Sequence, residues 1–255
     1  MRPPAVAGSF YPGDPTELRS TIEELLAGVQ PEPDNAFAYV VPHAGYRWSG
    51  PTAAHVYGRL AGREAERLII LGPAHRVPLR GAAVPAESMW STPLGAVTID
   101  TEAVGDLVAG GLAVADDRPH ADEHALEVQL PLLQVLGFSK VLPVCIGVAA
   151  VEEVAALLAV AAVPGSIVLC STDLSHYLTQ EQAEAADART VDAIVRLAPG
   201  DIGERAACGR YALRGLLAWA RDLELTARVL HQATSGDEGG PRDRVVGYVA
   251  ATLGV

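Results

Sequence analysis

The sequence has few basic residues and no long apolar run, which excludes two broad classes of protein. Lys and Arg number 19 against 31 Asp and Glu, a formal net charge of −12. Because phosphate binding needs clustered basic side chains and those here are scattered, we expect no nucleic-acid partner. The Ala/Val-rich run 151–163 is shorter than the roughly 20 apolar residues of a membrane span, and Glu152 and Glu153 open it. We therefore expect no membrane association.

Cysteine is scarce as well. Three cysteines, an odd number in a chain of 255 residues, do not make a disulfide framework. Cys145 and Cys170 lie inside apolar runs, so we expect both to be small buried hydrophobes. The sequence after Met1 is rich in turn residues and lacks the apolar core of a signal peptide. We expect a cytoplasmic protein.

What the sequence does contain is an alternation of short apolar runs with longer helical patterns. With 49% hydrophobic residues and no repeat or long linker, it predicts one domain over residues 1–255. Continuous apolar strands separated by helices favour an α/β fold whose central sheet is mainly parallel or mixed and flanked by helices. The expected strands are 37–41, 68–71, 97–100, 140–146, 167–170, 225–231 and 244–252. The expected helices are 16–26, 52–60, 102–109, 123–136, 151–160, 180–197 and 210–222. The stretch 90–95 indicates a turn into an added strand, possibly antiparallel.

Histidines follow the ends of three predicted strands. His43 comes after 37–41, His75 after 68–71, and Asp173 with His176 after 167–170. In open α/β sheets, ligands bind outside the carboxyl ends of the strands. A single loop histidine is more often solvated than a ligand, but three at equivalent positions indicate a shared site. If the shared site holds a metal ion, His176 is a possible additional ligand, although we expect Asp173 to orient the ring of His176 instead.

The remaining histidines differ in context. His55 lies in a helical pattern and His231 in a strand, so we expect structural roles, and His120 is assigned none. His124 lies in the predicted helix start Glu123–Leu136. A helix N-terminus disfavours a cation, so His124 is expected to stay neutral and to act as a base or hydrogen-bond partner. The alternative is an ordinary amphipathic helix start.

Cys208 has different neighbours from the other two cysteines. It precedes Gly209-Arg210 at the start of a predicted helix, where an arginine and the helix dipole favour the thiolate. The thiolate is the form that binds metals and attacks electrophiles. A lone cysteine of this kind is more often structural, so this signal is weak by itself.

Eight segments in order along the chain resemble the Memo family. They are 4–12 (PAVAGSFYP), 42–46 (PHAGY), 71–75 (LGPAH), 90–95 (WSTPLG), 123–131 (EHALEVQLP), 171–177 (STDLSHY), 208–210 (CGR) and 245–248 (VVGY). The sequence departs from the family pattern at Thr172 and Ala125, where Ser is usual or common. It also departs in the loop 235–240, which lacks a second Asp, and we carry no role over to that loop.

The resemblance implies a fold similar to the catalytic subunits of class III extradiol dioxygenases, which hold a non-haem Fe(II) with two His and one carboxylate. In Memo proteins the matching metal ligands are two His and one Cys, which here fall on His43, His75 and Cys208. Asp173, His176 and His124 match residues that line the same pocket, and we take them as catalytic candidates. Fe(II) is the expected metal, with copper or zinc possible because thiolate is a soft ligand.

Three functions are compatible with these expectations. The first is an iron-dependent redox enzyme similar to extradiol dioxygenases. The second is a metal-dependent hydrolase, in which the metal acidifies water. The third is a non-catalytic protein whose cleft binds a peptide or small molecule, since animal Memo relatives are associated with phosphotyrosine peptides. Bacterial relatives are often encoded beside a radical SAM protein, which makes such a protein an expected partner of the same pathway.

Overall fold

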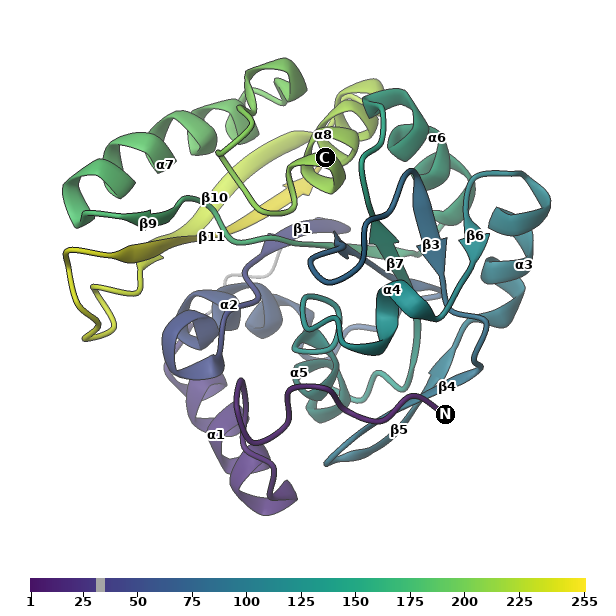
Figure 1. Ribbon diagram of the computed structural model, residues 1–255, viewed down its shortest axis with the longest axis horizontal. Helices are drawn as coiled ribbons and strands as arrows, with labels where there is room; N and C mark the ends of the chain where they lie inside the picture. The colour runs from purple at the N-terminus through teal and green to yellow at the C-terminus, as the bar shows by residue number, and fades with distance from the viewer. Residues whose placement is uncertain (31–34) are drawn as a thin grey trace.

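The computed structural model describes residues 1–30 and 35–255, which form one α/β unit (Figure 1). Its helices are α1 (Pro15–Ala27), α2 (Tyr46–Leu60), α3 (Thr101–Ala109), α4 (Arg118–Ala121), α5 (Gln129–Val135), α6 (Val151–Ala161), α7 (Gln180–Val195) and α8 (Arg210–Asp222), with a 3₁₀ turn at Pro199–Asp201. Its strands are β1 (Ala38–Val41), β2 (Leu68–Pro73), β3 (Ala82–Val84), β4 (Met89–Thr92), β5 (Gly95–Ile99), β6 (Val114–Ala115), β7 (Lys140–Ile146), β8 (Ile167–Ser171), β9 (His176–Leu178), β10 (Thr226–Thr234) and β11 (Val245–Gly254).

The strands form one mixed sheet in the order β10-β11-β1-β8-β2-β7-β3-β6. Its centre is parallel, because β1, β8, β2 and β7 pair in that order and run in the same direction. Antiparallel strands flank this centre, β11 and β10 on one side and β3 on the other. The predicted α/β fold with a mainly parallel or mixed central sheet is confirmed.

Helices cover both faces of the sheet, as Figure 1 shows. Successive strand residues alternate between two cores: Val40 packs with residues of α3, α6 and α8, whereas Tyr39 and Val41 pack with residues of α1, α2 and α5. Such alternation follows from the pleat of a strand, which points neighbouring side chains to opposite faces. Because both faces are buried, the central strands have the continuous apolar runs that the sequence displays.

Several local predictions are confirmed and two helices differ. Met89–Thr92 and Gly95–Ile99 pair antiparallel, as the turn at 90–95 suggested. The helix predicted at 52–60 begins earlier, at Tyr46, and contains Pro51. The helix predicted at 123–136 is wrong over its first half, because residues 123–124 are irregular, 125–128 form turns and α5 begins only at Gln129.

The two buried cysteines behave as expected, since Cys145 and Cys170 are both fully buried among apolar side chains. Across the described part of the chain, no helix is both long enough and apolar enough to span a bilayer.

Candidate metal centre

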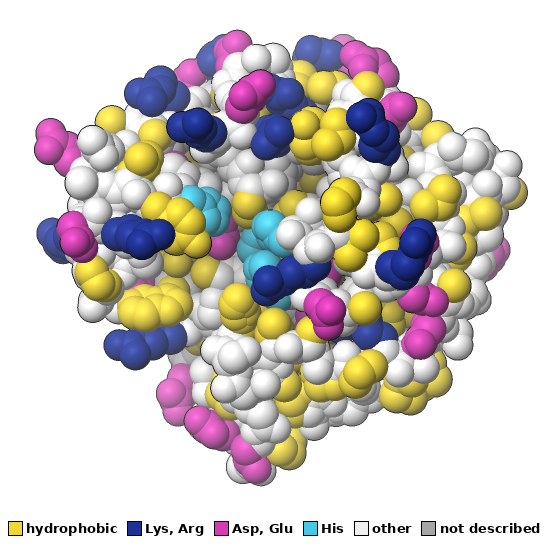
Figure 2. Space-filling view, in the orientation of Figure 1, with side chains coloured by type: hydrophobic (Ala, Val, Ile, Leu, Met, Phe, Trp, Pro, Cys, Tyr) yellow, Lys and Arg dark blue, Asp and Glu magenta, His cyan; other side chains and the backbone are white. Residues whose placement is uncertain are grey.

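The loops that follow three adjacent parallel strands meet in one cleft. The strands are β1, β8 and β2, and their carboxyl ends lead to His43, Asp173 and His75. A cavity of about 650 Å³ opens there. Figure 2 shows cyan histidine side chains in a hollow on this face of the molecule. All six candidate residues line the cavity: His43, His75, His124, Asp173, His176 and Cys208.

The ring of His43 is held in one tautomer. Its Nδ1 lies 2.9 Å from the hydroxyl oxygen of Ser171. That hydroxyl donates its only proton to the carbonyl of Ala125 over 2.6 Å, so it accepts from His43 and Nδ1 carries the proton. Nε2 is therefore unprotonated, and it lies within hydrogen-bonding distance of the Cys208 sulfur, at 3.1 Å. Burial, and next the nearby charge of His75, lower the pKa of His43 to about 3, so the ring is neutral at physiological pH.

A buried amide holds Ser171 in place. Gln129 donates from Nε2 to the Ser171 hydroxyl over 2.8 Å and to the carbonyl of Pro42 over 3.0 Å. Its own Oε1 accepts the hydroxyl proton of Tyr57. The sequence did not predict a role for Ser171 or Gln129. The pattern that could have indicated one is a polar residue, Ser171, at the end of a continuous apolar strand and another, Gln129, at the start of a buried helix.

Glu123 fixes His75 in the same manner. The His75 Nδ1 lies 2.9 Å from Oε1 of Glu123, and the His75 backbone N–H donates to Oε2 over 2.6 Å. The backbone N–H of Ala125 also donates to this carboxylate, over 2.9 Å. Burial alone would raise the pKa of Glu123, but the His75 ring and these N–H groups lower it to about 2. A permanent carboxylate at Nδ1 leaves Nε2 of His75 unprotonated, the pattern found for metal-binding histidines.

Cys208 brings the third donor to the cluster. Its sulfur accepts the backbone N–H of Asp173 over 3.3 Å. The expected low-pKa thiolate is wrong for the metal-free protein, since burial, followed by the Asp173 carboxylate, raises the pKa of Cys208 to about 12. The Arg210 side chain bonds instead to the carbonyl of Glu204 and the hydroxyl of Tyr211, so its charge does not serve the sulfur. A metal cation would supply the missing charge.

His124 lies in the cleft but not at a helix start. Its ring stacks on His75 with centroids 4.8 Å apart and meets Phe10 edge-on at the same separation. Burial, and next the charge of His43, lower the pKa of His124 to about 4. The expected neutrality therefore has burial as its cause, because α5 begins at Gln129, five residues later.

The segment 123–128 is not helical because its carboxylates have other partners. Glu127 is fully buried and accepts the N–H groups of Ala5 and Val6 and the hydroxyl of Tyr11. Arg2 forms an ion pair with it at 2.7 Å. Glu127 thus ties the N-terminal segment to the loop that carries Glu123, a contact that no local sequence pattern indicates.

Asp173 and His176 also differ from expectation in their partners. Asp173 accepts the backbone N–H of His43 over 2.7 Å, and burial raises its pKa. The ring of His176 is oriented by the carbonyl of Leu174, 2.8 Å from Nδ1, rather than by Asp173. Since a carbonyl only accepts, Nδ1 carries the proton and Nε2 of His176 has a free lone pair.

The donor atoms of His43, His75 and Cys208 fit one transition-metal ion. They lie within 4.8 Å of one another, and both imidazoles are fixed with an unprotonated Nε2. His75, Glu123 and His124 satisfy the same distance limit. That second set is the poorer one, because both oxygens of Glu123 already accept hydrogen bonds from His75.

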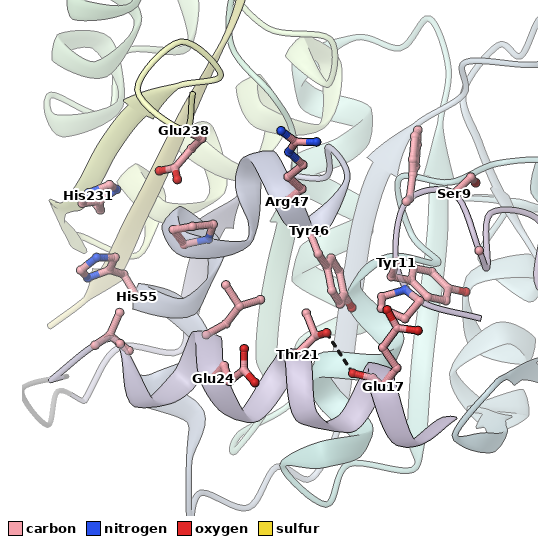
Figure 3. Close-up of a pocket in the computed structure, with 17 residues that line it drawn as sticks. Ser9, Tyr11, Glu17, Thr21, Glu24, Tyr46, Arg47, His55, His231 and Glu238 are labelled. Carbon is pink, nitrogen blue, oxygen red and sulfur yellow. Dashed lines mark hydrogen bonds between the residues drawn. The ribbon is translucent and has the colours of Figure 1, made fainter. Parts of the chain in front are cut away.

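A second groove of about 680 Å³ lies apart from these residues, between α1, α2 and β10 (Figure 3). His55 and His231 line it, and their rings stack in parallel with centroids 4.5 Å apart. Thr52 bonds to Nδ1 of His231. His120 is buried against Trp90, outside both cavities. The structural roles expected for His55 and His231 stay a prediction, since both rings line this groove.

Comparison with known proteins gives a consistent result over the whole chain. A family model described as Memo-like protein matches residues 2–252. A MEMO1 family protein of Methanopyrus kandleri is 39% identical, with 98% of this chain and 97% of the relative covered. One from Methanococcoides burtonii is 37% identical over 98% of each chain. One from Desulfurococcus amylolyticus is 35% identical over 98% of this chain and 97% of the relative.

Proposed function

The chain belongs to the Memo family, and on the geometry of its cleft we propose that it is a non-haem iron oxidoreductase. Fe(II) would be held by Nε2 of His43, Nε2 of His75 and Sγ of Cys208. The observation that carries the proposal is the pair of fixed tautomers: Ser171 and Glu123 each accept an Nδ1 proton, which leaves both Nε2 atoms unprotonated in the cluster with the sulfur. An ordinary surface histidine has no need of such support.

The number of donors favours a reactive metal over a structural one. Structural zinc sites close with four protein ligands, whereas this cluster supplies three. When bound there, Fe(II) would supply oxygen binding and electron transfer at its open positions, as in class III extradiol dioxygenases. The thiolate is softer than the carboxylate of those enzymes, so copper and zinc are the competing metals.

The residues around the cluster would bind the substrate and move protons. His176 offers a free lone pair on Nε2, which suits a proton acceptor at the wall of the cleft. His124 lies against His75 and is neutral, so it can accept a proton or a hydrogen bond from the substrate. Asp173 holds the backbone of His43 and so keeps the two strand-end loops in register. The cavity volume suits a small molecule or a short peptide segment.

The test is metal identity and oxygen uptake in protein purified without oxygen. We expect about one iron per chain, located by element-specific anomalous scattering between the two imidazoles and the sulfur. The Fe(II) protein should consume oxygen, and His43→Ala, His75→Ala and Cys208→Ser should each abolish both iron binding and uptake. Cys145→Ser, a buried cysteine outside the cleft, is the matched control.

Two results would contradict the redox proposal. Retention of zinc alone, without oxygen uptake, would favour the hydrolase or the binding protein. Oxygen uptake that ends after about one equivalent per chain and leaves Cys208 oxidised would indicate damage to the thiolate rather than turnover.

A further inference from the structure

The charge at the mouth of the cleft is opposite to that of the protein. The chain carries a net charge of −12, yet the exposed charged residues that line the cavity are Arg76 and Arg244. Asp173, the carboxylate among the lining residues, is buried at the floor. Figure 2 shows dark blue Lys and Arg side chains beside the hollow that holds the histidines. Among the described residues, neither arginine lies within ion-pair distance of a carboxylate.

Tyr177 stands at the same mouth in an unfavourable backbone conformation. Its φ is +60°, in the left-handed region that favours glycine, and its side chain is 64% exposed. The cause is a β-bulge: His176 pairs with Val246 and Leu178 with Val245, so Tyr177 is an extra residue in β9. Bulges of this kind occur next to active sites, where they redirect a side chain. Backbone strain at a tyrosine whose side chain is mostly exposed points to a role other than packing of the fold.

The bulge also brings the tyrosine and an arginine together. Arg244 precedes the first paired residue of β11, and its guanidinium lies 4.4 Å from the centre of the Tyr177 ring. Stacking on an aromatic ring restricts the arginine while leaving its N–H groups available to a ligand. Arg244 and Tyr177 therefore place a positive charge beside a flat aromatic ring at the mouth of the cavity.

We infer that the substrate of this cleft is a small organic carboxylate with a planar apolar group, held at the mouth by Arg76 and Arg244 and packed against Tyr177. A guanidinium pairs with both oxygens of a carboxylate, and the tyrosine ring offers a face to the planar part. The inference rests on the proposed function, since it names the substrate class of the same site. The bulge would then serve recognition at the cost of backbone strain.

The test is a chemical-shift titration of the full-length protein with benzoate, acetate, phenylphosphonate, benzamide and benzylamine, in metal-free and zinc-loaded form. Benzoate should bind more tightly than acetate and more tightly than the neutral and cationic analogues. Arg76→Gln and Arg244→Gln should each weaken benzoate binding by about tenfold. Arg189→Gln, an exposed arginine of α7 away from the cavity, should leave it unchanged.

Tyr177→Gly gives a second, independent readout. It should remove the preference for benzoate over acetate while raising the melting temperature, because glycine adopts the left-handed conformation without strain. The inference is overturned if benzylamine or benzamide binds as tightly as benzoate, or if phenylphosphonate binds more tightly than benzoate. It is also overturned if Arg76→Gln and Arg244→Gln bind benzoate as Arg189→Gln does. Metal content is measured on the same samples. Loss of anion binding with the metal site intact refutes the substrate class alone, whereas failure to bind metal refutes the proposed function.

Discussion

Replacing Glu123 by glutamine should weaken metal binding through the tautomer of His75. The carboxylate can only accept, and therefore keeps the His75 proton on Nδ1. A glutamine amide can instead donate to Nδ1, which moves the proton to Nε2, the atom that would bind the metal. Loss of such a supporting group commonly reduces metal affinity by about 10–100-fold. We expect a loss of this size for Glu123→Gln.

The same substitution should lower the stability of the metal-free protein. Glu123 accepts three hydrogen bonds, two from His75 and one from Ala125. A hydrogen bond to a charged group exceeds a neutral one by about 1 kcal/mol, so three give roughly 3 kcal/mol. Urea unfolding of the metal-free protein measures this loss in the free energy of unfolding. Competition with a chelator for Co²⁺ or Zn²⁺ measures affinity, and ¹⁵N chemical shifts report the His75 tautomer.

Glu127→Gln is the matched control for this prediction. Glu127 is equally buried and also accepts three hydrogen bonds, and it forms an ion pair with Arg2, but its partners belong to the N-terminal segment and not to a metal ligand. The Glu127→Gln variant should be less stable than the unmodified protein, and its metal affinity should stay within about twofold of that protein's affinity. If Glu123→Gln binds metal as tightly as Glu127→Gln, with the His75 proton still on Nδ1, the tautomer argument is refuted.

Three further outcomes are expected. Cys208→Ser should weaken Co²⁺ binding by at least about tenfold and remove the thiolate-to-cobalt charge-transfer absorption, and persistence of that band would exclude sulfur ligation. Asp100→Asn should cost about 1–3 kcal/mol at pH 7. Burial raises the pKa of Asp100, but hydrogen bonds from a backbone N–H, Lys140 and Arg67 outweigh it and lower that pKa. The difference in free energy of unfolding between the variant and the unmodified protein, measured in urea, should therefore shrink as pH falls below about 4. Gly247→Ala should destabilise by about 1–3 kcal/mol or more in thermal unfolding, since a Cβ there overlaps the buried Asp187 carboxylate, and an unchanged melting temperature would contradict this contact.

The strand-end placement of His43 and His75 is a property that the sequence alone revealed. Each follows a continuous apolar run, and the rule that parallel strands open their carboxyl ends to ligands placed both on one edge. Cys208 was different, because local pattern made it a weak candidate and the family resemblance made it a ligand. Its position 3.1 Å from the His43 ring depends on α8 packing beside β8, which no periodicity encodes.

The errors have a common cause, which is that long-range partners override local propensity. Residues 123–128 have acidic and apolar spacing typical of a helix, yet Glu123 and Glu127 bond to His75 and to the N-terminal segment. A low pKa was expected for Cys208 from a neighbouring arginine, but burial and the direction of that side chain decide the opposite.

Hydrophobic periodicity and strand-end position are local properties of the chain, so the sequence predicted the fold class, most of the helices and strands, and the edge of the sheet at which the candidate site lies. Which nitrogen of each imidazole is unprotonated, and which carboxylate supports which ring, follow from the folded structure alone. Those features depend on hydrogen bonds between residues that are dozens to more than a hundred positions apart, such as Ser171 with His43 and Glu123 with His75. Local pattern contains no information about such distant partners.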